Sequence, residues 1–291
     1  MTTPSPEAGV RIGFIGLGAM GAPMAERLRS GGYPVSLWAR RLRTLDRFPR
    51  DGYGRAASPT ELAAVSDVVC ICVAGDDDVR EVLLGPVGVL AGLAECAVVI
   101  VHSTVAPRTC AELAESALDR GAVLLDAPVS GGTWAAAVGT LTVMVGGDAA
   151  AFTRVRPVLE RLGSVVRHVG ETGAGQRMKL LNNALSFSNG RIASIAIENA
   201  VRLGLELEAV LAVLRSSSAR SFSLDVIADH VLPDAGWADR TRAITSKDTE
   251  LYAAMIAAAG LPPDELLRLA RQRVEHAGPE LDAITPDAAR G

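Results

Sequence analysis

Residues 11–32, RIGFIGLGAMGAPMAERLRSGG, decide the fold of this chain. The stretch opens with apolar residues that suit a buried parallel strand, and it continues with apolar residues at helical spacing that stop at a glycine pair. Between the two lies the pattern G-x-G-x-x-G. This order of strand, glycine turn and helix is the context in which the pattern holds a dinucleotide, whereas a bare glycine trio would be weak evidence.

Each glycine of the pattern has its own physical reason. Gly16 allows the tight turn, Gly18 lets a pyrophosphate approach the backbone, and Gly21 lets helix and strand pack closely. The helix N-terminus adds N–H groups and the positive end of its dipole. We therefore predict a bound dinucleotide, the alternative being a tight turn without a ligand. The predicted contacts are Gly16, Leu17, Gly18, Ala19, Met20 and Gly21.

The composition indicates a globular protein that acts on small partners. Hydrophobic residues make up 49% of the 291, and 29 Lys and Arg stand against 33 Asp and Glu, which argues against a surface for nucleic acid. The longest apolar stretch, 87–101, is interrupted by glycines and Glu95, so no membrane span is predicted. The first ten residues lack a basic start and an apolar core, and we interpret them as a frayed tail and not a secretory signal.

Four cysteines bear on the compartment. Cys70 and Cys72 are two apart in a predicted strand, so they point to one face but cannot form an ordinary disulfide or a C-x-x-C site. We predict that these two, with Cys96 and Cys110, are reduced thiols packed as small hydrophobes. Reduced thiols favour the cytoplasm.

The end of the second predicted strand, residues 35–38, bears on the choice of cofactor. A chain that prefers NAD carries an acidic residue near this point, where it bonds the ribose hydroxyls. Here Ala39 is followed by Arg40 and Arg41. Arginine can hold a 2′-phosphate with charge-assisted hydrogen bonds, so we predict NADP, with NAD as the alternative. A solvated basic helix face is the other interpretation of these arginines.

Two further strand ends supply candidate cofactor residues. Val73 and Ala74 end the strand predicted at 67–74, at the carboxyl edge where open α/β sheets bind ligands. Thr104 follows the strand predicted at 97–101, and we place its hydroxyl near the nicotinamide ribose. His102 beside it is either an acid–base group or a strand-end residue with a structural hydrogen bond.

Two polar clusters need separate interpretation. Asp76, Asp77 and Asp78 come without a histidine or cysteine, so we predict that Asp76 or Asp77 caps a helix and that no metal binds. After the strand predicted at 123–125, the sequence DAPVSGG ends in Ser130, Gly131 and Gly132. Consecutive backbone N–H groups beside a hydroxyl can hold a carboxylate, although an ordinary glycine turn would look the same.

From Gln176 onward the apolar spacing is almost wholly helical. Further helices are predicted at 205–214, 222–230, 249–259 and 263–275. Lys179 lies in the helix that begins near Gln176. With Lys247 it is one of only two lysines in a chain that otherwise uses arginine. A titratable ammonium is retained where arginine would serve for charge alone, and Asn183 shares its helix face four residues on. A solvated lysine is the alternative.

Taken together, GFIGLGAMGAPMAERL, DAPVSGG followed by GTLTVMVGG, GAGQRMKLLNN and the late Lys247-Asp248 resemble the β-hydroxyacid dehydrogenases over nearly the whole chain. The resemblance implies an α/β protein: residues 1–170 form a Rossmann domain with a mostly parallel sheet, and residues 171–291 form an all-helical domain for substrate and dimerisation. It also implies a dimer or tetramer that transfers a hydride between NADP(H) or NAD(H) and a small 3-hydroxy acid or its semialdehyde.

The resemblance assigns roles to matching residues. Lys179 matches the catalytic lysine, Asn183 the asparagine beside the substrate, and Ser130, Gly131 and Gly132 the segment that grips the carboxylate. Val73, Ala74, Thr104 and Lys247 match cofactor-side positions. Ala39 and Ala74 depart from the family's usual Asn or Asp and Pro at those positions. The segment 214–224 is expected to line the substrate pocket.

Three rivals remain from the sequence. An imine reductase resembles this family but usually carries another residue at the lysine position. A 6-phosphogluconate-type decarboxylating enzyme has a larger helical part. A non-catalytic NADP-binding protein would bind the cofactor without turnover, and intact Lys179 and Asn183 argue against it.

Overall fold

The computed structural model describes residues 9–234, 236–276 and 278–279. The chain divides into two compact units, Met1–Lys179 and Leu180–Gly291, called here the Rossmann unit and the helical unit. The division falls within helix α7 (Ala174–Arg202), whereas the sequence pattern predicted a boundary after Gly170. The expected N-terminal tail falls mostly on residues 1–8, outside the described residues, as does most of the expected loose end after Ala277.

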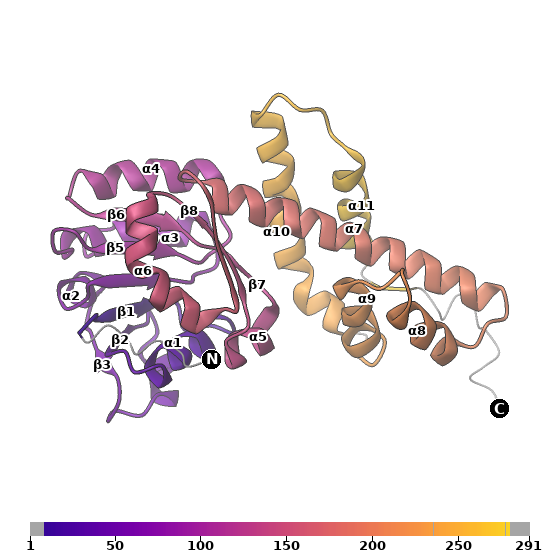
Figure 1. Ribbon diagram of the computed structural model, residues 1–291, viewed down its shortest axis with the longest axis horizontal. Coiled ribbons are helices and arrows are strands. Elements are labelled where there is room, and N and C mark those ends of the chain that lie inside the picture. The colour runs from indigo at the N-terminus through magenta and orange to yellow at the C-terminus, as the bar shows by residue number, and fades with distance from the viewer. Residues whose placement is uncertain (1–8, 235, 277, 280–291) are drawn as a thin grey trace. The chain divides into compact units, whose positions relative to one another are not determined.

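A largely parallel sheet forms the centre of the Rossmann unit (Figure 1). Its strand order is β3-β2-β1-β4-β5-β6-β8-β7, with β9 paired to β8. The first six strands in that order run parallel, β8 runs antiparallel to β6 and β7, and β9 runs parallel to β8. The strands are β1 (Ile12–Ile15), β2 (Val35–Trp38), β3 (Gly54–Arg55), β4 (Val68–Ile71), β5 (Val98–Val101), β6 (Val123–Asp126), β7 (Val129–Ser130), β8 (Thr142–Gly146) and β9 (Val165–Gly170).

Helices cover both faces of this sheet because alternate side chains of each strand point to opposite sides. Phe14 belongs to a core that includes α1 (Gly21–Ser30) and α6 (Ala149–Leu162). Its neighbour Ile15 belongs to a second core with α2 (Pro59–Ala64), α3 (Asp76–Leu84) and α4 (Pro107–Leu118). Shorter elements complete the unit: η1 (Leu42–Arg47), η2 (Val89–Ala91) and α5 (Gly132–Val138). The predicted α/β class is confirmed.

Helix starts in this unit test two predictions about capping residues. Ser58 before Pro59 is the sequence pattern of a helix start, and Ser58 Oγ does accept from the Glu61 N–H at 3.1 Å, so the cap that this pattern predicts is confirmed. The cap predicted at Asp76 or Asp77 is wrong, because the N-cap of α3 is Gly75 and both carboxylates lie inside its first turn. Asp76 Oδ1 instead accepts from the Ala106 N–H at 3.0 Å and from the hydroxyl of α4's Thr109.

The helical unit contains most of α7, then α8 (Leu207–Ser216), α9 (Phe222–Val226), the π-helical turn η3 (Ile227–Val231), α10 (Gly236–Ala258) and α11 (Glu265–Glu275). One core joins α7, α10 and α11, and another joins α7, α9 and η3. The all-helical prediction is confirmed. Among the described residues, no helix combines the length and apolar character needed to cross a membrane.

Helix α10 is longer than the predicted helix 249–259. Its first half, residues 236–248, is mostly polar and shows no clear apolar face. Trp237 nevertheless packs against the core of α7, α9 and η3, and Thr245 and Thr249 return hydroxyl hydrogen bonds to carbonyls one turn earlier. Tertiary packing at its two ends therefore stabilises a segment whose own pattern is weak.

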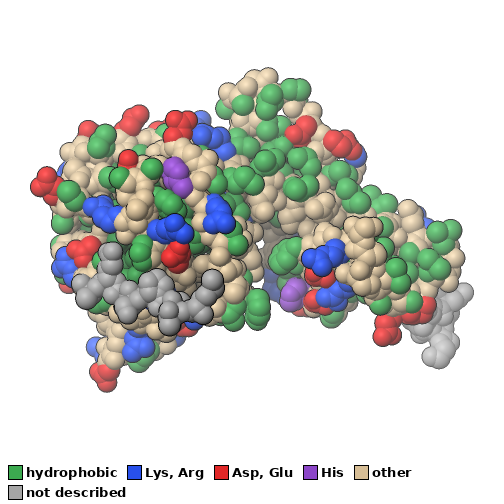
Figure 2. Space-filling model, in the orientation of Figure 1, with side chains coloured by type: hydrophobic (Ala, Val, Ile, Leu, Met, Phe, Trp, Pro, Cys, Tyr) green, Lys and Arg blue, Asp and Glu red, His purple; other side chains and the backbone are tan. Residues whose placement is uncertain are grey.

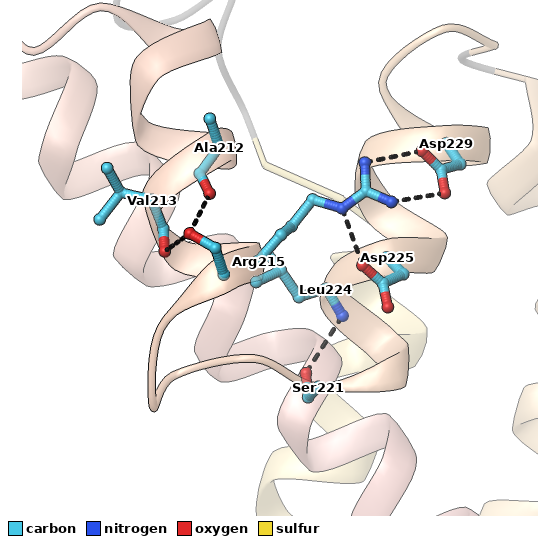
Figure 3. A network of polar contacts seen from close by, with 8 residues as sticks. Ala212, Val213, Arg215, Ser221, Leu224, Asp225 and Asp229 are labelled. Atoms are coloured by element: carbon cyan, nitrogen blue, oxygen red, sulfur yellow. Dashed lines mark hydrogen bonds and ion pairs between the residues drawn. The ribbon is translucent and has the colours of Figure 1, made fainter.

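Arg215 holds the connection between α8 and α9 (Figure 3). Its Nε donates to Asp225 at 2.8 Å, and its two terminal nitrogens donate to the carboxylate of Asp229 at 2.9 Å. Ser221 caps α9 by accepting from the Leu224 N–H at 3.2 Å. The segment 214–224, expected to line the substrate pocket, is therefore fixed at both ends within the helical unit.

Candidate functional site

The parallel strands of the Rossmann unit end in register. Ile15 pairs with Trp38 and Ile71, Ile71 pairs with Val101, and Val101 pairs with Asp126. The residues that follow these strands therefore lie along one edge of the sheet. This carboxyl edge is where open α/β sheets bind their ligands, and it receives most of the residues that the sequence singled out.

The glycine loop lies at this edge with the three roles visible in its geometry. Gly16 has φ +90°, and a Cβ there would lie 2.1 Å from the carbonyl oxygen of Cys72. A Cβ on Gly21 would lie 1.9 Å from the carbonyl oxygen of Gly16, so helix and strand touch there. A Cβ on Gly18 would have no neighbour within 4 Å. Gly18 thus borders open space, as a backbone that receives a pyrophosphate requires.

The start of α1 is suited to an anion. Met20, its N-cap, makes no side-chain capping hydrogen bond, and the first turn contains no acidic residue. Leu17 is buried in the core, so its contribution to a cofactor would come through its backbone. The helix therefore presents backbone N–H groups and its positive dipole end beside Gly18.

Arg40 is already engaged by carboxylates of α3. It donates to Asp78 Oδ1 at 2.9 Å and to Glu81 Oε2 at 2.7 Å. The hydrogen bond to Asp78 and the charge of Glu81 raise the pKa of Arg40. Arg41 is exposed and is the N-cap residue of η1. A 2′-phosphate at this strand end would therefore compete with Asp78 and Glu81 for Arg40, a competition that the sequence did not reveal.

The ends of β4 and β5 are tied to each other. The Val73 N–H donates to Ser103 Oγ at 2.8 Å, while Ala74 is exposed and Thr104 is half-buried. His102 is buried, its Nδ1 lies 2.8 Å from the carbonyl oxygen of Ala127, and its ring stacks on Phe14. Burial lowers the pKa of His102 to about 4, so the ring is neutral at pH 7 with the proton on Nδ1.

The predicted carboxylate segment is an open glycine turn. Ser130 pairs with Thr142 in the β7–β8 ladder, and Gly131 and Gly132 follow with φ +130° and +74° at the start of α5. A Cβ on Gly132 would meet nothing within 4 Å, whereas one on Gly131 would lie 2.7 Å from the Cβ of Ala135. The backbone at Gly132 is therefore accessible to a ligand.

Lys179 lies in the second turn of α7 and is only 8% exposed. The alternative of a solvated lysine is therefore wrong for this conformation. The start of α7 is fixed to the sheet edge, because Asp126 at the end of β6 accepts from the N–H groups of Gly173 and Gln176 at 2.7 and 2.8 Å. The same edge thus carries both the glycine loop and the helix turn that holds Lys179.

Asn183 and Asp248 form a buried polar pair in the helical unit, and the half-buried Lys247 lies beside Asp248. Asn183 Nδ2 donates to Asp248 Oδ2 at 2.8 Å, and Lys247 Nζ lies 3.3 Å from Asp248 Oδ1. Asp248 is 3% exposed, and its contact with Asn183 fixes which way the amide points. The roles predicted for Asn183 toward substrate and for Lys247 toward cofactor stay predictions.

Sequence reasoning missed three of the polar residues that organise these groups: Asp126, Gln176 and Asp248. Asp126 and Asp248 belong to motifs that carried the resemblance, but nothing in the motifs showed what their carboxylates contact. The available signals were an acidic residue ending an apolar strand and a glutamine among apolar helix residues, and both are common in surface positions.

Cysteine accessibility differs in part from the prediction. All four thiols are free, and burial raises the pKa of Cys72 to about 12 and that of Cys70 further still. Cys110 is also buried, but Cys96 is exposed, with a left-handed φ of 64° in the turn before β5.

On the face in view in Figure 2, acidic and basic side chains are interspersed over the Rossmann unit.

A family model for the NAD-binding domain of 6-phosphogluconate dehydrogenase matches residues 11–170, and one for the NAD-binding region of NADP-dependent 3-hydroxyisobutyrate dehydrogenase matches residues 173–287. The chain is 36% identical to 2-(hydroxymethyl)glutarate dehydrogenase of Eubacterium barkeri over 75% of its length and 73% of that protein's.

Solved structures of related enzymes share the fold of this chain. A 3-hydroxyisobutyrate dehydrogenase of Salmonella typhimurium is 30% identical with a TM-score of 0.79, covering 92% of this chain and 94% of that one. An imine reductase from Myxococcus stipitatus superposes with a TM-score of 0.62 at 20% identity, covering 91% of this chain and 94% of that one, which shows a shared fold alone.

A Rossmann sheet with an intact glycine loop, followed by a helical unit, defines a nicotinamide-dinucleotide-dependent oxidoreductase. The chain belongs to the β-hydroxyacid dehydrogenase family and is an NAD(P)-dependent hydroxyacid dehydrogenase. The predicted family and class of enzyme are confirmed.

Proposed function

We propose that this enzyme interconverts a small 3-hydroxy acid and its semialdehyde, uses NADP(H) in preference to NAD(H), and moves the proton with Lys179. The observation that carries the proposal is the burial of Lys179 in the second turn of α7, whose start is bonded to the end of β6. The glycine loop lies at the end of β1 on the same sheet edge.

The bound nicotinamide would supply the hydride in reduction and accept it in oxidation. In reduction the Lys179 ammonium donates a hydrogen bond to the carbonyl oxygen, stabilises its developing negative charge and gives up a proton. In oxidation the neutral amine takes the proton from the hydroxyl. Lysine suits both directions because an ammonium releases its proton far more readily than a guanidinium does.

Substrate orientation falls to two further groups. The hydroxyl of Ser130 and the backbone of Gly131 and Gly132 hold the carboxylate, a role supported by the positive φ of both glycines and the free space at Gly132. Asn183, one turn after Lys179, holds the reacting oxygen with an amide that Asp248 orients. Holding both ends of the acid fixes the reacting carbon between them.

Cofactor contacts follow the sheet edge. The loop from Gly16 to Gly21 receives the pyrophosphate, Val73, Ala74 and Thr104 border the nicotinamide half, and Lys247 contributes from the helical unit. Arg40 or Arg41 reads the 2′-phosphate. Support comes from the uncapped start of α1 and from the absence of a carboxylate at the end of β2.

Lys179→Ala tests the proposal. We expect NADPH binding, followed by fluorescence titration, within twofold of wild type, while turnover on 3-hydroxy acids and semialdehydes falls by on the order of 100- to 1000-fold. Lys179→Arg keeps the charge but not the exchangeable proton, so it should be comparably impaired. Retained turnover in Lys179→Ala would remove the assigned role.

A substrate panel separates the rivals. Wild-type enzyme is assayed with 3-hydroxy acids, semialdehydes and cyclic imines against NADP(H) and NAD(H). Turnover of imines alone would establish an imine reductase, and cofactor binding without any turnover would establish a non-catalytic NADP-binding protein. Turnover of hydroxy acids that depends on Lys179 is the expected result.

We further propose a homodimer or homotetramer. Met178, Leu181, Leu185 and Ile192 form a stripe along one face of α7, and each is 41–51% exposed. An apolar stripe on a long helix is typical of a surface covered by another subunit. Sedimentation analysis of the purified chain measures the number of subunits in the assembly.

We also propose a cytoplasmic location, which is supported by four free cysteines and is tested by cell fractionation.

A further inference from the structure

Asp126 is a buried carboxylate with two backbone partners. It is 0% exposed, its Oδ1 accepts from the Gly173 N–H at 2.7 Å, and its Oδ2 accepts from the Gln176 N–H at 2.8 Å. Burial raises the pKa of Asp126, while these hydrogen bonds act in the opposite direction. Burying a carboxylate costs free energy unless its oxygens accept hydrogen bonds. These two hydrogen bonds form only when the start of α7 lies where it does, so they stabilise that one position of the helix.

Gln176 ties the same helix turn to a second strand end. It is 0% exposed, its Nε2 donates to the carbonyl oxygen of Ser103 at 2.8 Å, and its Oε1 accepts from the Val105 N–H at 3.1 Å. The segment 103–105 contains the predicted cofactor residue Thr104. One turn of α7 is therefore bonded to the ends of both β5 and β6.

Glycines allow this close approach. A Cβ on Gly175 would lie 2.4 Å from the carbonyl oxygen of Met144 and 2.7 Å from that of Asp126. A Cβ on Gly146 would lie 2.6 Å from Asp126 Oδ1. The helix start and the sheet edge are thus in backbone contact, which leaves the first turn of α7 little freedom to shift.

We propose that Asp126 and Gln176 are positioning residues for Lys179: together they set the first turn of α7 against the sheet edge and so fix where the ammonium lies. Lys179 follows Gln176 by three residues, about 4.5 Å along the helix axis. A rigid helix passes a tilt or shift of its first turn directly to that position. Since a misplacement of about 1 Å can cost on the order of 100-fold in rate, loss of either anchor should lower turnover strongly.

This inference rests on the proposed function of Lys179, so the experiment separates the two. Asp126→Asn keeps the size of the side chain but replaces one accepting oxygen with a donor, and Gln176→Met keeps approximate length without either hydrogen bond. Asp148→Asn is the matched control, because Asp148 caps α6 in the same unit by accepting from the Ala151 N–H at 2.7 Å.

We expect kcat to fall about 10- to 100-fold in Asp126→Asn and Gln176→Met, with the NADPH Kd within twofold of wild type. Asp148→Asn keeps a capping oxygen, so it should change the Tm little and keep kcat within twofold. If Asp126→Asn does not fold, Gln176→Met decides the matter. A folded Gln176→Met with wild-type kcat, or an equal loss of kcat in Asp148→Asn, overturns the inference.

A double-mutant cycle distinguishes a role that acts through Lys179 from a purely structural role, because it compares the turnover of the single and double variants. If Asp126 acts through Lys179, adding Asp126→Asn to Lys179→Ala should leave the residual rate of the single Lys179 variant unchanged within about twofold. A further 10-fold loss in the double variant contradicts the inference. Retained turnover in Lys179→Ala alone refutes the proposed function instead.

Discussion

The three glycines of the nucleotide loop can be separated into packing and ligand-facing positions by single alanine substitutions. In Gly21→Ala the new Cβ would lie 1.9 Å from the Gly16 carbonyl oxygen, more than 1 Å short of the 3.4 Å at which ordinary contact begins. Backbone must move to relieve this contact, and such overpacking costs about 1–3 kcal/mol. Gly16→Ala adds the strain of a φ of +90° to a 2.1 Å clash.

Gly18→Ala should behave in the opposite way. Its Cβ would meet no atom within 4 Å and the position does not require a positive φ, so the apoprotein should be as stable as wild type or slightly more stable. The methyl group would, however, occupy the space beside which the pyrophosphate is expected to lie. We expect the NADPH Kd to rise at least about 10-fold, which corresponds to about 1.4 kcal/mol.

Thermal unfolding with and without NADPH measures both effects. At about 2–4 °C per kcal/mol, Gly21→Ala should lower the apoprotein Tm by roughly 2–12 °C. At the same saturating NADPH concentration, the ligand should stabilise Gly18→Ala by about 1.4 kcal/mol less than wild type, because stabilisation by a ligand depends on its concentration relative to Kd. A Gly18→Ala protein with wild-type NADPH affinity would show that the cofactor does not cross this loop. A Gly21→Ala protein with unchanged Tm would refute the packing argument.

Two further predictions concern charge. Asp78→Asn should release Arg40 toward the 2′-phosphate and tighten NADPH binding about 2- to 5-fold with NADH unchanged, whereas Asp77→Asn, whose side chain is fully exposed, is the control that should change neither Kd. His102 has a folded pKa of about 4 against an ordinary 6.5, so folding stability should fall as pH drops through that window, by up to about 3 kcal/mol. Urea unfolding from pH 7 to pH 4 should show a shallower fall in His102→Asn, and equal slopes in the two proteins would contradict the assignment.

The Rossmann unit could be predicted from sequence because its signals are local. Buried parallel strands are short apolar runs, and the glycine loop between β1 and α1 can be recognised within a stretch of 22 residues. Capping by Ser58 depends on a residue three positions away, and it was predicted correctly. The cap assigned to Asp76 or Asp77 failed because Asp76 bonds residues 30 and 33 positions further on, which its neighbours in sequence do not indicate.

The anchors of the candidate site could not be predicted for the same reason. Asp126 reaches Gly173 and Gln176 across 47 and 50 residues, and Asn183 reaches Asp248 across 65. Such contacts form only in the folded protein, so the periodicity of apolar residues and the spacing of motifs in the sequence do not predict them. Resemblance to a family located Lys179 and Asn183, but it did not show which groups fix their positions.

The use of lysine is the point at which sequence and structure support each other most directly. A chain that otherwise meets its needs for positive charge with arginine retains lysine only at positions 179 and 247. Lys247 faces the carboxylate of Asp248 at 3.3 Å, whereas Lys179 is 8% exposed at a helix turn bonded to the sheet edge. An ammonium can give up its proton and take it back near neutral pH far more readily than a guanidinium can. An arginine there would retain its charge throughout a reaction, and this difference makes proton transfer the simplest physical reason for a lysine at that position.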